Sequence, residues 1–355
     1  MKKILLGLIL LCSTSAWGDN TLAIDDFTIA AGEEMDIGVK MYNDVTFTAF
    51  QFELELPEGV SVKFDEDEEE YCVGRSSRLL NAHNVVSQYQ SNGAFKVMVY
   101  HNTNKNLKGN SGDVVLTLTL VASDQVSTGT FTPHINNIEM TEYNSTTQTA
   151  TKYKPEAVTY SCTVNINATV TTLGYASFSW PRALDFTNSG LTAFIAKDCN
   201  GQSIQLHEVT KVPANTGLIL KGIAGSENTY SLETTDEETL DDVSSNQLTG
   251  TASGAYTVEG ENIYVLSNLD DGTPGFYNAN EGIHVGQYKA YLAYTGDIPA
   301  RTGLTFDEGD AATGIESCKQ EEGKGSLLFY DLQGRNVNQP QKGVYVINGR
   351  KVIVK

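Results

Sequence analysis

Apolar and polar residues alternate along most of the chain after residue 19, a period typical of strands that bury one face. The run Phe50–Leu56 places phenylalanine and leucine on one face and glutamine and glutamate on the other. The same alternation recurs at 95–99, 114–120 and 158–166, and clusters of glycine, asparagine and serine separate the runs as turns do. Roughly nine such strands predict an antiparallel sandwich of jelly-roll or Ig-like type over residues 19–167.

Residues 168–310 are also rich in short apolar runs. These runs lie at 176–180, 191–196, 217–220, 256–258, 263–266 and 288–294. They predict a second all-β module, and the polar, glycine-containing stretch 311–326 is typical of a linker.

The last 29 residues predict a small C-terminal β-hairpin domain, residues 327–355. Asn348-Gly349 lies between the apolar stretches Val344–Ile347 and Lys351–Val354, and Asn-Gly flanked in this way is a strong hairpin signal. We call residues 327–355 the C-terminal tail. The whole chain is therefore expected to be all-β.

Three parts of the chain resemble known families. The phrases FTAFQFELELPEGVSV, GAFKVMVYH and GNSGDVVLTLTLVA resemble the cohesin-like jelly-roll module, which is related in fold to some carbohydrate-binding modules. This resemblance implies a sandwich with a surface interaction role, but it transfers no ligand residue. The phrases TTLGYASFSWPRALDF and GQYKAYLAY resemble a module that follows adhesin-like domains in Bacteroidetes surface proteins.

The third resemblance concerns the C-terminal tail. Its segments YDLQGR, GVYV and GRKVIVK resemble the C-terminal sorting domain of the Bacteroidetes type IX secretion system. The resemblance implies that secretion machinery recognises the tail.

The other end of the chain agrees with export. Lys2 and Lys3 precede the apolar run Ile4–Leu11, and Ala16-Trp17-Gly18 provides a small-residue cleavage site, so residues 1–18 are expected to be a signal peptide. Cys12 leaves lipidation open, although Leu11 stands where a lipobox has a small residue. No other stretch approaches 18 apolar residues, and we therefore expect a secreted or outer-surface protein without a membrane span.

Charge narrows the classes of partner. The chain has 24 basic and 44 acidic residues and a net charge of −20. A surface this acidic repels phosphate backbones and anionic lipids, which argues against nucleic-acid and membrane-surface binding. The excess of acid lies before residue 315, whereas the segment that follows is net basic.

Four cysteines remain after the signal peptide: Cys72, Cys162, Cys199 and Cys318. They allow three disulfide pairings. Cys162 falls in the apolar register of its strand, so a buried free thiol is expected there.

Metal sites and catalytic motifs are scarce. The run Asp65–Glu70 lacks the spacing and glycine of a calcium loop and is expected to be a solvated turn, whereas Asp270 and Asp271 before Gly272 are weak calcium candidates. Calcium is therefore the one cofactor left open. The five histidines are scattered, and there is no nucleophile elbow, P-loop or dinucleotide fingerprint. We expect no enzyme, although a hydrolase using two carboxylates remains an alternative.

Aromatic rings supply the candidates for ligand binding. Trp180, Tyr277 and Tyr291 are weak candidates for stacking on sugars, with core packing as the alternative for each. Tyr291 faces away from Tyr288 and Leu292 on its predicted strand, which makes it the ring most expected to be exposed.

The sequence therefore predicts an exported, surface-associated, non-enzymatic recognition or adhesion protein. Its partner is expected to be a polysaccharide or a surface protein, bound through the cohesin-like sandwich. The alternative functions are a carbohydrate-binding accessory protein of a polysaccharide-degrading system and an unrecognised hydrolase.

Overall fold

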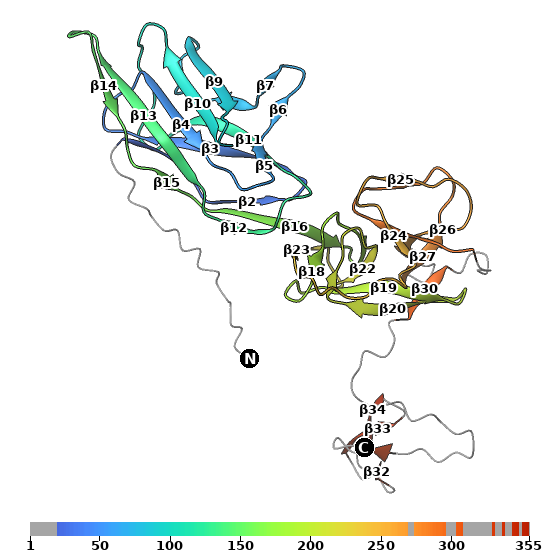
Figure 1. Ribbon diagram of the computed structural model, residues 1–355. Coiled ribbons are helices and arrows are strands. Elements are labelled where there is room, and N and C mark those ends of the chain that lie inside the picture. Colours follow the sequence, from blue (N-terminus) through green and yellow to red (C-terminus); the bar gives the residue numbers. More distant parts are fainter. Residues whose placement is uncertain are drawn as a thin grey trace. The chain divides into compact units, whose positions relative to one another are not determined.

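All regular elements are β-strands in this computed structural model, which describes residues 20–268, 273–295 and 303–307 and four strands within 329–354 (Figure 1). The chain divides into two compact units, Met1–Gly309 and Asp310–Lys355. Within the described residues, no helix is suited to crossing a membrane. The predicted all-β class is confirmed.

The first sheet of the N-terminal sandwich has five strands. In hydrogen-bonded order they are β1 (Thr21–Ile24), β3 (Glu34–Tyr42), β11 (Val114–Ala122) and β5 (Val60–Val62), with β8 (Val73–Arg75) also paired to β11. Between β5 and β8, the strands β6 (Phe64–Asp65) and β7 (Glu70–Tyr71) form a short hairpin. Its tip carries the acidic run, with residues 66–70 exposed.

The second sheet of the sandwich has six strands. They are β14 (Thr149–Tyr153), β13 (His134–Asn144), β4 (Ala49–Leu54), β10 (Phe95–His101) and β9 (His83–Tyr89), with β15 (Val158–Thr159) also paired to β13. Its inward side chains include Phe50, Phe52 and Phe95, which join Leu116 and Leu118 of the first sheet in one core. The alternation predicted for these strands is confirmed.

A third sheet continues from the sandwich into the second module. It contains β12 (Gly129–Phe131), β16 (Cys162–Val170), β23 (Asn228–Thr234), β18 (Leu184–Asp185), β21 (Lys211–Val212) and, parallel to β16, β2 (Phe27–Ala30). Residues 162–165 of β16 pair with β2, and residues 166–170 pair with β23. The expected boundary between residues 167 and 168 thus lies inside a single strand.

The second module is built on a nine-stranded sheet. In order, its strands are β17 (Tyr175–Phe178), β22 (Leu218–Lys221), β19 (Thr192–Cys199), β20 (Ser203–Val209), β30 (Leu304–Asp307), β27 (Pro274–Asn278), β26 (Ile263–Asn268), β29 (Ala290–Ala293) and β24 (Leu248–Gly250). Two further strands, β25 (Tyr256–Thr257) and β28 (His284–Val285), form a separate two-stranded sheet. Along the chain they fall between strands of the nine-stranded sheet.

The two end regions of the nine-stranded sheet approach each other. Just after β17, the Ser179 amide donates a hydrogen bond to the Tyr288 carbonyl, 3.1 Å away and just before β29. A separate cluster of buried side chains, including Phe194, Phe276 and Leu292, forms a core for this module. This close approach requires glycine at position 250, because a Cβ there would lie 2.7 Å from the Asn215 carbonyl oxygen and 2.7 Å from the Ser179 Cβ.

The C-terminal unit contains a four-stranded sheet. Its strands are β32 (Asn336–Val337), β31 (Phe329–Tyr330), β33 (Gly343–Ile347) and β34 (Arg350–Val354), in that order. Gly343 pairs with Val354 and Ile347 with Arg350, which confirms that these two strands form the predicted antiparallel pair, while Asn348 and Gly349 lie outside the described residues. The expected linker 311–326 lies outside the described residues.

The described cysteines Cys72, Cys162 and Cys199 are free thiols, and Cys318 lies outside the described residues. Cys162 is 0 % exposed, as its apolar register predicted. Burial disfavours the thiolate and raises the pKa of Cys162 to about 11.

We expect Cys162 to resist alkylation in the native chain and to react fully once the chain is unfolded. The reason is that the reactive thiolate is both scarce and inaccessible in the folded state. Iodoacetamide labelling at mildly alkaline pH, with and without denaturant, followed by peptide mass spectrometry measures this. A Cys162→Ala variant is the control, and rapid labelling of native Cys162 would contradict the burial.

Candidate functional site

The candidate site lies on the second sheet of the sandwich, the six-stranded sheet that contains β4, β9, β10 and β13. It occupies the outer face of this sheet, which is turned away from the sandwich core. On β4, Phe52 points into the core, whereas Gln51 and Glu53 point outward, as strand geometry requires. On β10 the outward positions include Met98 and Tyr100, which are apolar or aromatic where polar residues are the norm. These exposed apolar and aromatic side chains indicate that the outer surface of β10 and its neighbouring strands is a candidate binding surface.

Three of these side chains form a contiguous group. Met98 and Tyr100 are each 37 % exposed, and Val86 on β9 is 51 % exposed. Val86 lies directly opposite Met98 in the register of β9 and β10, and Tyr100 is two residues from Met98 on the same face. We call Val86, Met98 and Tyr100 the apolar patch.

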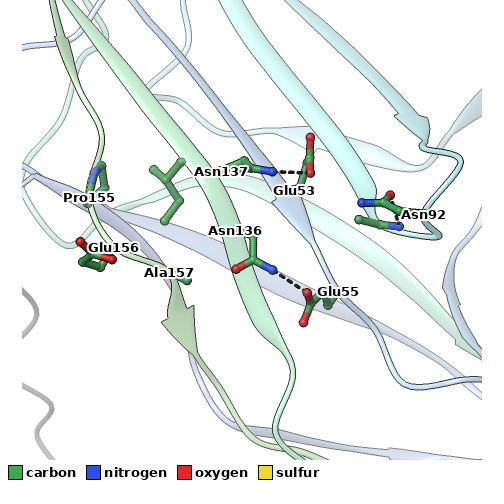
Figure 2. Close-up of a pocket in the computed structure, with 10 residues that line it drawn as sticks. Glu53, Glu55, Asn92, Asn136, Asn137, Pro155, Glu156 and Ala157 are labelled. Carbon is green, nitrogen blue, oxygen red and sulfur yellow. Dashed lines mark hydrogen bonds between the residues drawn. The ribbon is translucent and has the colours of Figure 1, made fainter.

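A polar cavity of about 360 Å³ opens on the same sheet (Figure 2). It is lined by Glu53, Glu55, Asn92, Ala94, Asn136, Asn137, Ile138, Pro155, Glu156 and Ala157. Figure 2 shows the Asn137 amide directed at Glu53 and the Asn136 amide directed at Glu55. We call this cavity the polar pocket.

A β-bulge in β13 builds part of the pocket. The register between β13 and β4 shifts between Asn136 and Glu139, and Asn137 adopts a left-handed backbone with φ 50°. Asn137 Nδ2 donates a 2.7 Å hydrogen bond to Glu53 Oε2. Asparagine tolerates this conformation better than most residues, and bulges commonly redirect side chains at functional surfaces.

A lysine and a histidine lie beside two carboxylates of this face. Lys96 Nζ lies 3.8 Å from Glu53 Oε1, and His134 Nδ1 lies 3.2 Å from Glu55 Oε2. Farther along β13, hydrogen bonds from Lys152 and then Lys154 hold the pKa of Glu139 below its ordinary value. The face therefore combines an apolar patch with a charged and amide-rich surround.

Nothing in the described part of the chain groups three or more histidine, cysteine, aspartate or glutamate side chains in a way suited to a metal. The calcium candidates Asp270 and Asp271 lie outside the described residues, so that site stays a prediction. The amides that bind Glu53 and Glu55 are hydrogen-bond donors, and a cation would have to displace them.

The structure places the three predicted sugar-binding rings apart from the sandwich face. Trp180 is only 4 % exposed and packs between Phe178 and Tyr288. Tyr277 on β27 is half-buried. Tyr291 is also half-buried, and its ring stacks on Tyr256 with centroids 4.5 Å apart.

The sequence reasoning missed the apolar patch and Asn137. A signal for Met98 and Tyr100 was present, because both occupy the polar register of the run Phe95–His101. Val86 and the bulge at Asn137 gave no comparable signal, since each depends on which strands become neighbours.

No protein-family model and no curated protein matches this chain. Among solved structures, the seventh ScaB type I cohesin from Pseudobacteroides cellulosolvens is similar, with 15 % identity and a TM-score of 0.35 over 42 % of this chain and 94 % of the cohesin. A cohesin in a cohesin–dockerin complex from Clostridium thermocellum has 13 % identity and a TM-score of 0.32, covering 41 % and 99 %. A non-cellulosomal cohesin from Archaeoglobus fulgidus has 16 % identity and a TM-score of 0.29, covering 41 % and 91 %. TM-scores this low do not decide a function, and the sandwich is established by its own sheets and register.

We expect Asn137→Ala to destabilise the protein by about 1 kcal/mol more than Asn137→Gly. Both variants lose the hydrogen bond to Glu53, but only alanine adds the cost of a left-handed backbone. Urea unfolding of the two variants and the parent measures the difference. Equal destabilisation by alanine and glycine would mean that the bulge does not hold residue 137 in this conformation.

Proposed function

We propose that this chain is an exported, non-enzymatic recognition protein. Its N-terminal sandwich binds a protein partner through the outer face of the second sheet, which contains β9 and β10. The observation that carries the proposal is the contiguous exposure of Val86, Met98 and Tyr100 on that face. Exposed apolar groups surrounded by polar ones are typical of a recognition surface.

The chemistry of the patch favours a protein over a polysaccharide. Valine and methionine have no flat ring face to stack on a sugar, whereas methionine and tyrosine are both enriched at protein interfaces. The surround includes Glu53, Glu55 and Glu156. We therefore expect the partner to present an apolar centre flanked by basic side chains.

A photo-crosslinking amino acid at position 98 of the full chain should capture a surface protein from the producing bacterium or its neighbours as a defined adduct. The same amino acid at Ser61, an exposed position on β5 of the opposite sheet, is the matched control. Unlabelled parent protein should compete for the adduct, whereas a Met98→Ala/Tyr100→Ala variant should compete at least about tenfold less well.

Two results would contradict the proposal. One is equal competition by the parent and the double variant, which would place the contact elsewhere. The other is binding to a purified glycan that persists in the double variant but is lost in Glu53→Gln, which would assign the sandwich to carbohydrate at the polar pocket. Turnover of that glycan would refute the non-enzymatic part.

Export through the C-terminal tail is a separate part of the proposal. It is supported by the signal-like residues 1–18 and by the resemblance of residues 327–355 to a type IX sorting domain. We expect a chain lacking 327–355 to accumulate inside the producing bacterium, while the full chain reaches the medium or the outer surface. Cell fractionation with immunoblotting measures this, and equal delivery of both chains would exclude a sorting role for the tail.

A further inference from the structure

Strand β9 ends its sheet with an open edge. Within the described residues it pairs only with β10, and that register runs unbroken from Tyr89–Phe95 to His83–His101. A strand in this position exposes one row of backbone N–H and C=O groups, which another strand can pair with.

The hydrogen bonds at the β9–β10 turn show which residues form this row. The Gln90 amide donates to the Ala94 carbonyl at 2.9 Å, so Gln90 directs its backbone toward β10. Because antiparallel ladders alternate, Gln88, Val86 and Asn84 do the same. Val85 and Ser87 therefore direct their backbone groups to the open edge, where no described residue hydrogen-bonds to them.

The edge lacks the usual protection against pairing. Proteins commonly guard edge strands with lysine, proline or a bulge. The strand reads His83-Asn84-Val85-Val86-Ser87-Gln88-Tyr89 and contains none of these. Burial lowers the pKa of His83 below its ordinary value, so β9 is uncharged at neutral pH. By contrast, β14 at the other end of the same sheet carries Lys152.

We propose that β9 pairs antiparallel with β9 of a second copy of this chain, around a two-fold axis at Val86. A second copy suits the edge because β9 is complementary to itself around Val86: only uncharged side chains lie opposite one another, so the contact adds no repulsion to that of a chain with a net charge of −20. A charged or basic strand would gain nothing from a neutral edge.

The two-fold axis fixes the register. Val86 lies opposite Val86, and Val85 lies opposite Ser87, so the outward backbone groups form about four hydrogen bonds. Asn84 faces Gln88, and no like charges meet. The register also brings together the two exposed Val86 side chains, each 51 % exposed in the single chain. The pairing covers the sides of these two valines that face each other and leaves their outer faces part of the apolar patch.

Such pairing goes beyond the proposed recognition function and does not depend on it. The two sheets would become one, and the apolar patches of both copies would be continuous across the axis. Two copies of one recognition face bind a repeated surface more tightly than a single copy, through effective concentration.

Sedimentation velocity on the full chain over a range of concentrations tests the pairing without any partner. We expect the parent to reach twice the mass of one chain and Ser87→Pro to remain a single chain, because proline removes an N–H that faces the edge. Ala150→Pro on β14 is the control on the opposite edge, because the Ala150 amide also faces away from its neighbouring strand, and it should leave the dimer unchanged.

A charge exchange at the axis tests the register itself. Val86→Lys and Val86→Glu should each be monomeric, because like charges would lie opposite each other, and an equimolar mixture should form a heterodimer. Circular dichroism confirms that each variant is folded. A monomeric parent, a Ser87→Pro dimer, or a mixture that stays monomeric would each overturn the proposal. An adduct from position 98 between two copies has twice the mass of one chain, which distinguishes it from an adduct with the proposed partner.

Discussion

The shared strand β16 is the constraint on which the rest of the large unit depends. Its first half hydrogen-bonds to β2 and β12 of the sandwich and its second half to β23 of the second module. Val164, Ile166 and Val170 along it are at most 1 % exposed. Each such side chain contributes about 1.5–3 kcal/mol by burial. A break in β16 would therefore expose parts of two modules at once, which explains why the chain up to Gly309 is a single compact unit.

Side-chain contacts reinforce this join. Tyr288, just before β29, donates from its hydroxyl to Asp124 Oδ2 at 3.1 Å, and Arg182 donates to the Gln125 carbonyl and to Ser127 Oγ. Tyr288 holds a left-handed backbone, φ 61°, while its ring packs on Trp180. Trp180 thus packs at the join between the modules, and the core does not depend on the side chains of the outer sheet face.

The sequence predicted the strands well because burial on one face leaves a period of two that needs no knowledge of neighbours. The runs around Phe52, Val97 and Leu118 were readable for that reason. The candidate site was predicted less well. Tyr291 was expected to be exposed because its side chain faces the opposite side of the strand from that of Leu292. In the structure, Tyr256 from a distant segment covers part of its ring. The sequence shows that Met98 is an apolar residue at a position where polar residues alternate. Only the structure shows that Val86 is its cross-strand neighbour and that the two form part of the apolar patch.

The sequence by itself determined the all-β class, the buried Cys162, the hairpin of the C-terminal tail and the acidic net charge. These follow from local alternation, turn chemistry and composition. Only the tertiary structure decided that β16 serves two modules, that a bulge directs Asn137 at Glu53, and that β9 ends its sheet with an uncharged edge. The reason is physical: strand order and register depend on pairing between segments far apart in the chain, and no local pattern encodes which segments will meet.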